Sequence, residues 1–565
     1  MNGFFFKRIA VWLLIIAIII AVAACSKPAQ SDVTPAPTEG NSTEPNEKPA
    51  STPDAEETPP PENTDRWGKY DPPIDMVQVF GIHSNIKFHE GEDIYNNVWT
   101  RSYLEDLGIK LTYEWVVDAS EFGEKMNLAI TSGDLPDVFT VNPTQYKMLS
   151  DEGLIWDMTD IFEQYASENT KDVMTQDPIG YKSMHIDGRL MGLAYTDSSP
   201  GTCSLLWIRK DWLDKLGIPE PENMNDVLEI AEAFVRVDPD GNGEDDTYAF
   251  AFTGSARSFY PFMNAFHAYP SIWVLQDNGK LAHGSIQPEM KAALAKLQDM
   301  YKSGLIDPEF AVKDPGEDIV NGKIGMTYHA WWGIFANLPY TRVNNPEADW
   351  KAYPPMSIDE GIGKTQYSNA VGSYHVVNKN YQYPEAAVKM YNYWFDIIRN
   401  QTKENLERYL ADPENPDIVY YHYINLIGWE PFSTVSDQLW AALESGDPTG
   451  LPYNAVATYD LIMKYHEDNS YIEGWATHRG NGLGGSESIL RMVGNDRGVF
   501  NQFYGIPTPT MAEKMPALDA MMEEMILDIV LGAPLDNFDR YVEDWKRLGG
   551  DDITSEVNEW YQRNK

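Results

Sequence analysis

An alternation of strand-like and helix-like segments, starting near residue 76, restricts the fold of this chain most. Residues 76–80 form an apolar run typical of a buried strand, residues 93–107 repeat apolar side chains at helical spacing, and residues 109–116 alternate as a strand does. A second helix is predicted at 120–132 and a third strand at 138–141. Because strands and helices follow one another in this order, the sequence predicts an α/β fold with a parallel sheet covered by helices.

The same alternation continues further along the chain. A strand-like run at 205–208 precedes a short predicted helix at 210–216, and residues 225–235 and 288–302 also show helical spacing. Residues 273–281 read as a hairpin, with Asp-Asn-Gly predicted to form a type I′ turn. No repeat of 20–50 residues is visible, which disfavours a solenoid or a propeller.

Charge and size exclude several classes of partner. The 565 residues are 43% hydrophobic, which suits more than one hydrophobic core. With 43 Lys+Arg against 86 Asp+Glu, the formal net charge is −43, so the chain lacks the basic footprint of a nucleic-acid-binding protein. The charge also argues against a strongly anionic ligand unless Arg479 or similar cations line the site. The two cysteines cannot form a multi-disulfide framework.

The first 24 residues have the pattern of an export signal. Lys7 and Arg8 precede an apolar run at 9–24 that is shorter than the ~20 residues of a membrane-spanning helix. Residues 22–25, Val-Ala-Ala-Cys, resemble the lipobox of bacterial lipoproteins. That resemblance implies cleavage before Cys25, lipidation of its thiol and an anchor on the extracytoplasmic face of the cell membrane. A plain signal anchor with an incidental cysteine is the alternative.

The segment after the signal has the composition of a tether. Residues 26–64 are rich in Pro, Thr, Ser and Glu and contain almost no large apolar side chain, so they cannot bury enough surface to fold. Residues 25–70 are therefore predicted to be a lipidated cysteine followed by a disordered tether. The remaining cysteine, Cys203, lacks a basic context and is predicted to be a small packed residue.

Five motifs in the rest of the chain carry a family resemblance. They are Ser132–Asp137 (SGDLPD), Trp207–Pro219 (WIRKDWLDKLGIP), Gly304–Phe310 (GLIDPEF), Gly322–Met326 (GKIGM) and Asp551–Trp560 (DDITSEVNEW). Together they resemble the bacterial extracellular solute-binding proteins of family 1, in the large lipoprotein branch that serves ABC importers, mainly of carbohydrates. The resemblance implies a type II periplasmic-binding-protein-like fold, in which two α/β lobes joined by hinge crossings close on a ligand.

The resemblance also places the lobes. It implies a first lobe at 71–198 and 372–430 and a second lobe at 199–371 and 431–565, with crossings near 194–203, 371–372 and 428–431.

One loop in the predicted second lobe has the donors of a calcium site. Asp238, Asp240 and Asn242 stand at positions 1, 3 and 5 of an EF-hand-like loop, Glu244 would offer a backbone carbonyl at position 7, and Asp246 stands at position 9. Position 12 is an alanine where an EF-hand has Glu, but related alginate-binding proteins carry a similar truncated loop. A structural calcium ion is therefore predicted, and a solvated turn without an ion is the alternative.

The predicted ligand site consists mainly of aromatic side chains, because sugars stack on aromatic rings. Trp331 and Trp332 follow the Gly322–Met326 motif, where related proteins place an aromatic residue in the cleft. The further candidates are Tyr374, Trp475, Arg479, Tyr195, Trp273 and Trp429. A packed core position is the alternative for each aromatic residue.

The glycine-rich turn after Arg479 matches a nucleotide motif only in letters. Gly480-x-Gly-x-x-Gly485 satisfies the dinucleotide fingerprint, but it does not follow a strand. We interpret it as a mobile loop of the ligand cleft.

Two other functions compete with solute binding. The first is a lipid-anchored glycan hydrolase, which would need a pair of catalytic carboxylates. The chain shows no H-E-x-x-H or G-x-S-x-G motif of other hydrolase classes, and it lacks the eight repeated units of a barrel hydrolase. A sensor subunit of the same fold is the second alternative. The sequence favours a binding protein that is not an enzyme.

The resemblance further implies what this protein binds and what it docks on. An oligosaccharide would be captured between the lobes, and the closed monomer would dock on the permease subunits of an ABC transporter. Because the chain has no Walker A motif, the ATPase would be a separate chain.

Overall fold

The computed structural model describes residues 65–564, with gaps at 84–85, 87, 89, 176, 197–202, 368–370, 400–401, 406–407, 410–430, 452, 483 and 495–496. The predicted signal peptide, the lipidation site Cys25 and nearly all of the predicted tether lie outside the described residues. In the part of the chain that is described, no helix combines the length and the apolar character needed to cross a bilayer.

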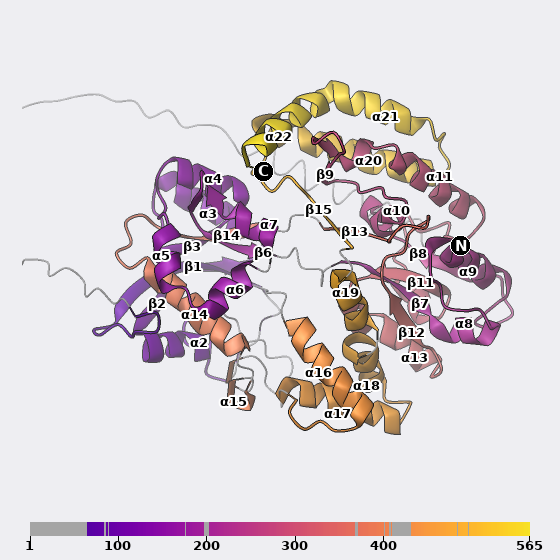
Figure 1. The fold of residues 1–565 in the computed structure, drawn as a ribbon, viewed down its shortest axis with the longest axis horizontal. Coiled ribbons are helices and arrows are strands. Elements are labelled where there is room, and N and C mark those ends of the chain that lie inside the picture. Colours follow the sequence, from indigo (N-terminus) through magenta and orange to yellow (C-terminus); the bar gives the residue numbers. More distant parts are fainter. Residues whose placement is uncertain are drawn as a thin grey trace, which may run out of the picture. The chain divides into compact units, whose positions relative to one another are not determined.

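The first hydrophobic core is built from two distant stretches of sequence (Figure 1). Its elements are β1 (Ile74–Ile82), α2 (Val98–Ser102), η1 (Tyr103–Leu107), β2 (Ile109–Asp118), α3 (Phe122–Ser132), β3 (Val138–Val141), α4 (Pro143–Asp151), α5 (Thr159–Tyr165), α6 (Glu168–Thr175), α7 (Pro178–Ser183), β4 (His185–Ile186), β5 (Arg189–Leu190), β6 (Leu193–Thr196), β14 (Val371–Val377), α14 (Glu385–Arg399) and α15 (Lys403–Asn405). The α/β fold class is confirmed, and the exact lobe boundaries stay a prediction.

The sheets of this core differ in one respect from the expected parallel sheet. β1 and β2 pair in parallel as predicted. β3, however, does not extend their ladder, because it pairs antiparallel with β14, which also pairs antiparallel with β6. Next to β1, the carboxylate of Asp137 accepts a hydrogen bond from the Val77 amide at 2.7 Å, and the Asp137 amide donates to the Val77 carbonyl at 2.9 Å. The prediction of a third parallel strand in this ladder was therefore wrong.

A capping residue also shortens the first predicted helix. The apolar pattern predicted a helix over 93–107, but α2 begins at Val98 because the Asn97 side chain accepts the Trp99 and Thr100 amides while the Thr100 hydroxyl accepts the Asn97 amide. This reciprocal capping box fixes the start of the helix. The end is as predicted: Gly108 adopts a φ of 69° after η1.

The second sheet has the strand order β12 (Trp350–Tyr353), β7 (Leu205–Arg209), β11 (Ile324–His329) and β8 (Tyr248–Ala251), and it separates two hydrophobic clusters. Because side chains alternate along a strand, Leu206 and Ile208 of β7 join one cluster and Leu205 and Trp207 join the other. The strand is buried on both faces, which explains its continuous apolar sequence.

The elements around this sheet come from two stretches of sequence, 205–367 and 431–564. They are β7 (Leu205–Arg209), α8 (Lys210–Leu216), α9 (Met224–Arg236), β8 (Tyr248–Ala251), η3 (Ala256–Phe259), α10 (Tyr260–Asn264), β9 (Trp273–Leu275), β10 (Leu281–His283), η4 (Gly284–Ile286), α11 (Glu289–Lys302), α12 (Gly316–Val320), β11 (Ile324–His329), η5 (Trp331–Phe335), η6 (Leu338–Tyr340), α13 (Thr341–Asn344), β12 (Trp350–Tyr353), β13 (Thr365–Tyr367), α16 (Pro431–Ser445), α17 (Tyr453–Glu467), α18 (Ile472–Thr477), η8 (His478–Gly482), α19 (Gly485–Gly494), β15 (Gly498–Phe500), α20 (Pro509–Val530), α21 (Asn537–Trp545), η9 (Lys546–Gly550) and α22 (Asp551–Asn564). Helices α16 and α17 share a small cluster of their own.

The hairpin β9–β10 forms where it was predicted, but with a different turn. A type I′ turn requires positive φ at both central residues. Asn278 does not have a positive φ, whereas Gly279 has a φ of 75°. The Gly279 amide donates to the Gln276 carbonyl, and the Gln276 amide donates to the Lys280 carbonyl. The connection is therefore a tight turn followed by a left-handed glycine, a common longer hairpin loop.

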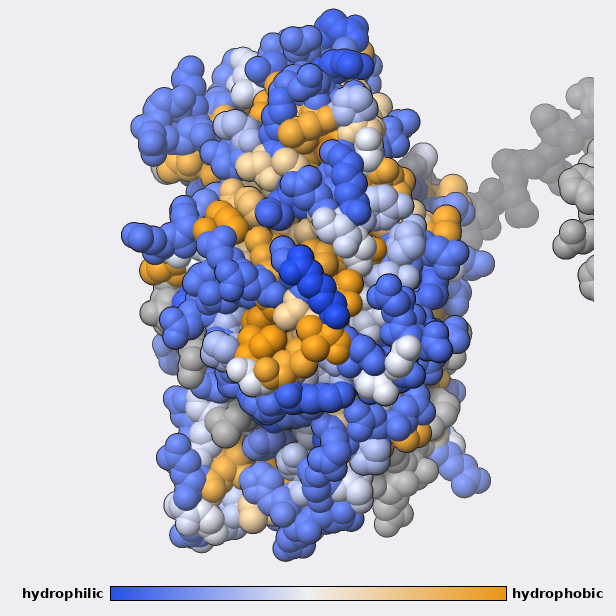
Figure 2. Space-filling model, turned by 90° about the vertical axis from the view of Figure 1, so that its right-hand side faces the viewer, coloured by the Kyte–Doolittle hydropathy of each residue, from blue (hydrophilic) through white to orange (hydrophobic). Residues whose placement is uncertain are grey.

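Most of the acidic charge faces water. Among the described residues, Asp307 and Asp318 are the buried acids, and Lys313 pairs with both. Figure 2 shows one face of the molecule on which hydrophilic residues dominate and apolar residues gather in separate patches. The net negative charge is thus mainly a solvated coat, which favours solubility.

A strap at the N-terminal edge of the described chain, Asp65–Tyr70, is held by two buried polar residues of α14. Lys389 is fully buried, donates to the Gly68 carbonyl at 3.1 Å and lies 4.7 Å from the centre of the Tyr70 ring. The Asn392 amide donates to the Tyr165 carbonyl at 2.7 Å and to the Arg66 carbonyl at 3.4 Å. The strap therefore belongs to the folded core, although the sequence assigned it to the tether.

We expect removal of this strap to destabilise the protein through Lys389. A body beginning at Asp71 should lose about 3 kcal/mol of unfolding free energy relative to one beginning at Asp65, because a buried ammonium loses its partners. In a Lys389→Met background the same truncation should cost clearly less. Urea denaturation of the four proteins measures this difference, and equal losses in both backgrounds would contradict it.

Burial of His283 predicts a loss of stability in acid. This side chain lies between Trp273 and Trp545, with ring centroids 5.0 and 5.3 Å away. Neither ring nitrogen has a hydrogen-bond partner among the described residues, and burial lowers its pKa to about 4. The unfolded chain binds the proton near the ordinary pKa of about 6.5, so folding stability should fall as the pH drops from about 6.5 toward 4.

The variant His283→Phe tests this expectation. Replacing the imidazole should remove about 2 kcal/mol of the stability lost between about pH 7 and 5. The measurement is the urea midpoint at each pH, and the exposed His83, changed to Gln, provides the control. Identical acid profiles for His283→Phe and the unmodified protein would rule out this role.

Candidate functional site

Two half-exposed aromatic rings follow the central strand β11. η5 places Gly333 and Ile334 in the core, whereas Trp332 and Phe335 remain 49% and 45% exposed. His329, at the end of β11, packs edge-on against Trp332 with ring centroids 4.6 Å apart. The segment therefore presents two large aromatic side chains to solvent beside a rigid strand, as a stacking surface for a ligand requires. We call Trp331–Phe335 the aromatic segment.

Behind the aromatic segment lies the glycine-rich turn of η8 and the start of α19. A Cβ on Gly480 would lie 2.7 Å from the Phe335 ring, and one on Gly485 would lie 3.1 Å from the Trp331 Cβ. The Gly480 carbonyl accepts a hydrogen bond from Ser486 at 3.0 Å. The glycines are thus explained by close packing against aromatic side chains, and the turn follows helix α18 rather than a strand.

Asp349 joins this turn to the sheet. Its Oδ1 accepts hydrogen bonds from Trp475 Nε1 at 2.9 Å and Arg479 Nε at 2.8 Å, and its Oδ2 pairs with the same guanidinium. Its amide donates to Asp211 at 3.1 Å, and its carbonyl accepts the Lys210 amide at 2.7 Å. Asp349 belongs to no recognisable motif, so its role could not be predicted from the sequence.

The structure places three predicted aromatic ligand residues in the core. Trp475 is fully buried, Trp273 is 2% exposed, and Tyr374 is 3% exposed and stacks on Tyr146 with ring centroids 3.9 Å apart. In this conformation they offer a ligand almost no surface. Their roles as ligand residues stay predictions.

The other predicted ligand residues differ in accessibility. Among those that the structure describes, Trp332 is the most exposed, and Trp331 is half-buried against the core and packs edge-on to Phe335. The sequence argued against a strongly anionic ligand unless cations such as Arg479 line the site. Because Arg479 pairs with Asp349, it does not provide a free cation for such a ligand. The Tyr195 side chain and Trp429 lie outside the described part of the chain. Phe335 was not predicted, although it stands three residues after Trp332, at helical spacing.

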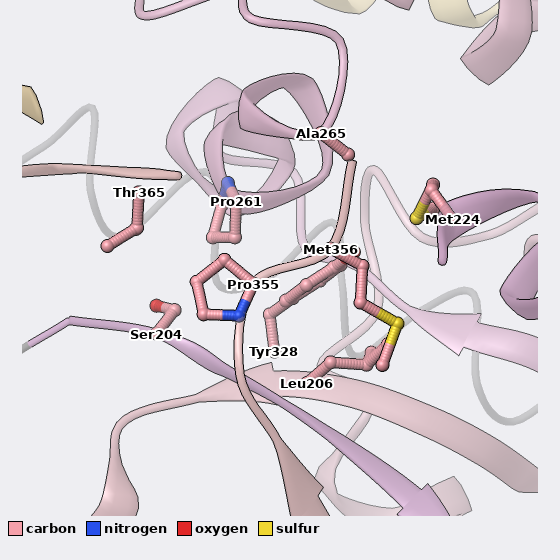
Figure 3. A pocket seen from close by; sticks show the side chains of 9 residues that line it. All are labelled: Ser204, Leu206, Met224, Pro261, Ala265, Tyr328, Pro355, Met356 and Thr365. Carbon is pink, nitrogen blue, oxygen red and sulfur yellow. The ribbon is translucent and has the colours of Figure 1, made fainter. Parts of the chain in front are cut away.

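A small cavity lies against strands β7 and β11 of the second sheet, close to the segment before β13. It has a volume of about 10 Å³ and is lined by Ser204, Leu206, Met224, Pro261, Ala265, Tyr328, Pro355, Met356 and Thr365. Figure 3 shows Ser204 and Thr365 on one side of it and Met224 on the other. This volume suits one water molecule and is too small for a sugar ring.

The predicted calcium loop is folded around the Asn242 side chain. The Asn242 amide donates to Asp240 and to Asp246, both at 2.9 Å. Asp238 accepts the Gly241 and Gly243 amides at 2.9 and 3.0 Å. Asp238, Asp240 and Asp246 therefore all accept hydrogen bonds from other residues of the loop.

Electrostatics in the loop combine repulsion with one ion pair. Burial and the neighbouring Asp238 raise the pKa of Asp240. Asp246 pairs with Lys323 at 2.6 Å, and its hydrogen bonds to Asn242 and Lys323 lower its pKa. Across the described residues, no group of three or more His, Cys, Asp or Glu is arranged to hold a metal ion. The donor types suit calcium, but Lys323 and the Asn242 amide occupy two of the carboxylates.

Comparison with curated proteins identifies relatives among lipoproteins and transport proteins. The chain is 23% identical to lipoprotein LipO of Bacillus subtilis over 81% of this chain and 87% of that protein. It is 29% identical to the fructooligosaccharide ABC transporter substrate-binding protein FusA of Streptococcus pneumoniae, over 46% of this chain and 50% of FusA. It is 26% identical to the polygalacturonan/rhamnogalacturonan-binding protein YtcQ of Bacillus subtilis, over 36% of this chain and 40% of YtcQ.

Solved structures show the same fold. An HMO-binding, ABC-transporter-associated solute-binding protein of Bifidobacterium longum infantis aligns with a TM-score of 0.60 at 15% identity, over 86% of this chain and 98% of that chain. The alginate-binding protein AlgQ2, solved without calcium ion, aligns with a TM-score of 0.56 at 17% identity, over 89% of this chain and all of that chain. An EF-hand mutant of FusA aligns with a TM-score of 0.54 at 18% identity, over 87% of this chain and all of that chain.

A family model matches a stretch that contributes to both hydrophobic cores. Residues 90–396 match the model of the bacterial extracellular solute-binding proteins, which is more than half of the sequence. The match runs from the first core through β11 and the aromatic segment to helix α14. The chain belongs to the family of bacterial extracellular solute-binding proteins.

Proposed function

We propose that this protein captures an oligosaccharide outside the cell and delivers it to an ABC importer. One observation carries the proposal: Trp332 and Phe335 expose about half of their surface beside the central strand of a solute-binding fold. Aromatic faces of this size are what pyranose and furanose rings stack on. The names of FusA and YtcQ, which describe oligo- or polysaccharide binding, support a carbohydrate as the ligand class.

The rest of the assembly follows from this proposal. Cys25 would carry the lipid anchor, residues 26–64 would form a tether, and the body would dock on permease subunits served by a separate ATPase. The protein would bind its ligand without converting it. A glycan panel distinguishes this function from a hydrolase: saturable binding with the sugar recovered intact supports it, and turnover would contradict it.

The ligand surface is tested by removing one ring. Trp332→Ala should weaken binding of a sugar found in that panel at least about tenfold, or about 1.4 kcal/mol, because a stacking surface is lost. Isothermal titration calorimetry measures the change without relying on tryptophan fluorescence. Trp67, 44% exposed on the strap, provides a matched control as Trp67→Ala. Unchanged affinity in Trp332→Ala would remove the aromatic segment from the site.

We also propose that the loop 238–246 holds a structural calcium ion. Asp238, Asp240 and Asn242, with Asp246 and the Glu244 carbonyl, would supply oxygen ligands for this hard cation. Burial and the neighbouring Asp238 raise the pKa of Asp240, and a bound cation would offset both effects. The buried Thr247 hydroxyl, which has no partner among the described residues, is a further oxygen next to the loop. Bound calcium would fix the connection between α9 and β8.

Calcium should therefore raise the thermal stability of the protein. We expect a melting temperature several degrees higher in excess calcium than in EDTA, following the linkage between ligand binding and stability. Asp240→Asn should abolish this difference. The exposed neighbour Asp245, changed to Asn, should preserve it. Equal melting curves in calcium and EDTA for the unmodified protein would show that the loop is only a solvated turn.

A further inference from the structure

Asp349 stands where three separate parts of the chain meet. Its backbone bonds to Lys210 and Asp211 at the start of α8, it immediately precedes β12, and its carboxylate receives side chains from α18 and η8. The Asp349 side chain is 20% exposed and the Arg479 side chain is 18% exposed. The ion pair is therefore well shielded from water, and removing one partner would leave the other poorly solvated.

A second arginine supports the same point. Arg342 donates to the Ala348 carbonyl at 2.9 Å and to the Asn469 carbonyl at 2.6 Å. Its guanidinium lies 5.0 Å from the centre of the Trp475 ring. Trp475 is thus fixed in two ways, by a cation over its face and by Asp349 at its Nε1. These contacts hold helix α18 and the following turn against the segment before β12.

The turn that follows Arg479 packs directly against the aromatic segment. A Cβ on Gly484 would lie 2.2 Å from the Arg479 carbonyl oxygen, so the turn folds tightly back on this residue. Gly480, which follows Arg479 in the sequence, packs against Phe335, and Gly485 packs against Trp331. The turn is further held by Trp440 Nε1, which donates to the Gly482 carbonyl at 2.7 Å. A shift of Arg479 would therefore move the surface on which Trp331 and Phe335 rest.

We propose that Asp349 is a positioning residue for the sugar site. It touches no ligand, but it holds Arg479 and Trp475 and so fixes the glycine-rich turn that supports Trp331 and Phe335. The inference rests on the proposed function, because it assigns Arg479 and Trp475 to the support of the ligand surface instead of to the ligand itself. Loss of the Asp349 charge should loosen the turn and weaken sugar binding together.

Hydrogen–deuterium exchange tests the structural half of the proposal without any ligand. Asp349→Asn should increase exchange in residues 478–486 and in the aromatic segment, while α11 and α20 keep their protection. Asp349→Glu should restore part of the protection because the charge is retained. Arg479→Gln removes the other partner and serves as the second variant if Asp349→Asn does not fold. Asp519→Asn, a change of a half-buried carboxylate on α20, is the control.

Binding tests the functional half. Kestose, maltotriose and trigalacturonic acid are titrated calorimetrically into the unmodified protein and the variants. For whichever of these sugars binds, Asp349→Asn and Arg479→Gln should raise the dissociation constant at least tenfold, and Asp349→Glu should recover part of the affinity. Unchanged affinity in both would overturn the proposal and leave the proposed function intact. If no glycan binds the unmodified protein, the proposed function fails, and unchanged exchange in Asp349→Asn would still overturn the positioning role.

Discussion

The first core depends on a strand that arrives late in the sequence. β14 lies between β3 and β6 and pairs with both, yet it follows the whole β7–β13 region along the chain. The sheet cannot close before residue 377, and α14 covers the core only after that. The intervening residues must fold as an insertion between two neighbouring strands. Such non-local pairing delays folding, because the entropy of closing a long loop has to be offset before the ladder forms.

This constraint also explains what the sequence could and could not predict of the fold. Local periodicity identified β1, β2, α3 and β3 because each signal lies within one short segment. The partner of β3 is non-local, so nothing in residues 138–141 indicates that β14 takes the place beside it. The start of α2 was missed for a local reason: a capping asparagine outweighs the apolar pattern upstream of it.

At the candidate site, position after a motif predicted an exposed aromatic side chain, whereas polar surroundings did not. The aromatic segment was found because it follows a recognisable strand motif, and its Trp332 is half-exposed. Trp475 and Arg479 were placed at a ligand because their surroundings are polar and rich in glycine. In the structure those glycines make room for aromatic rings, and the polar groups satisfy one another through Asp349. A lone aspartate before a strand gives no sequence signal, since its partners come from two distant segments, at 210–211 and 475–479.

The strap has a mechanical consequence. Because Lys389 and Asn392 hold residues 65–70 on α14, the covalent connection to everything upstream enters the fold at the first core. A force applied to the chain upstream of Asp65 would therefore act first on the contacts that Lys389 and Asn392 make with residues 65–70.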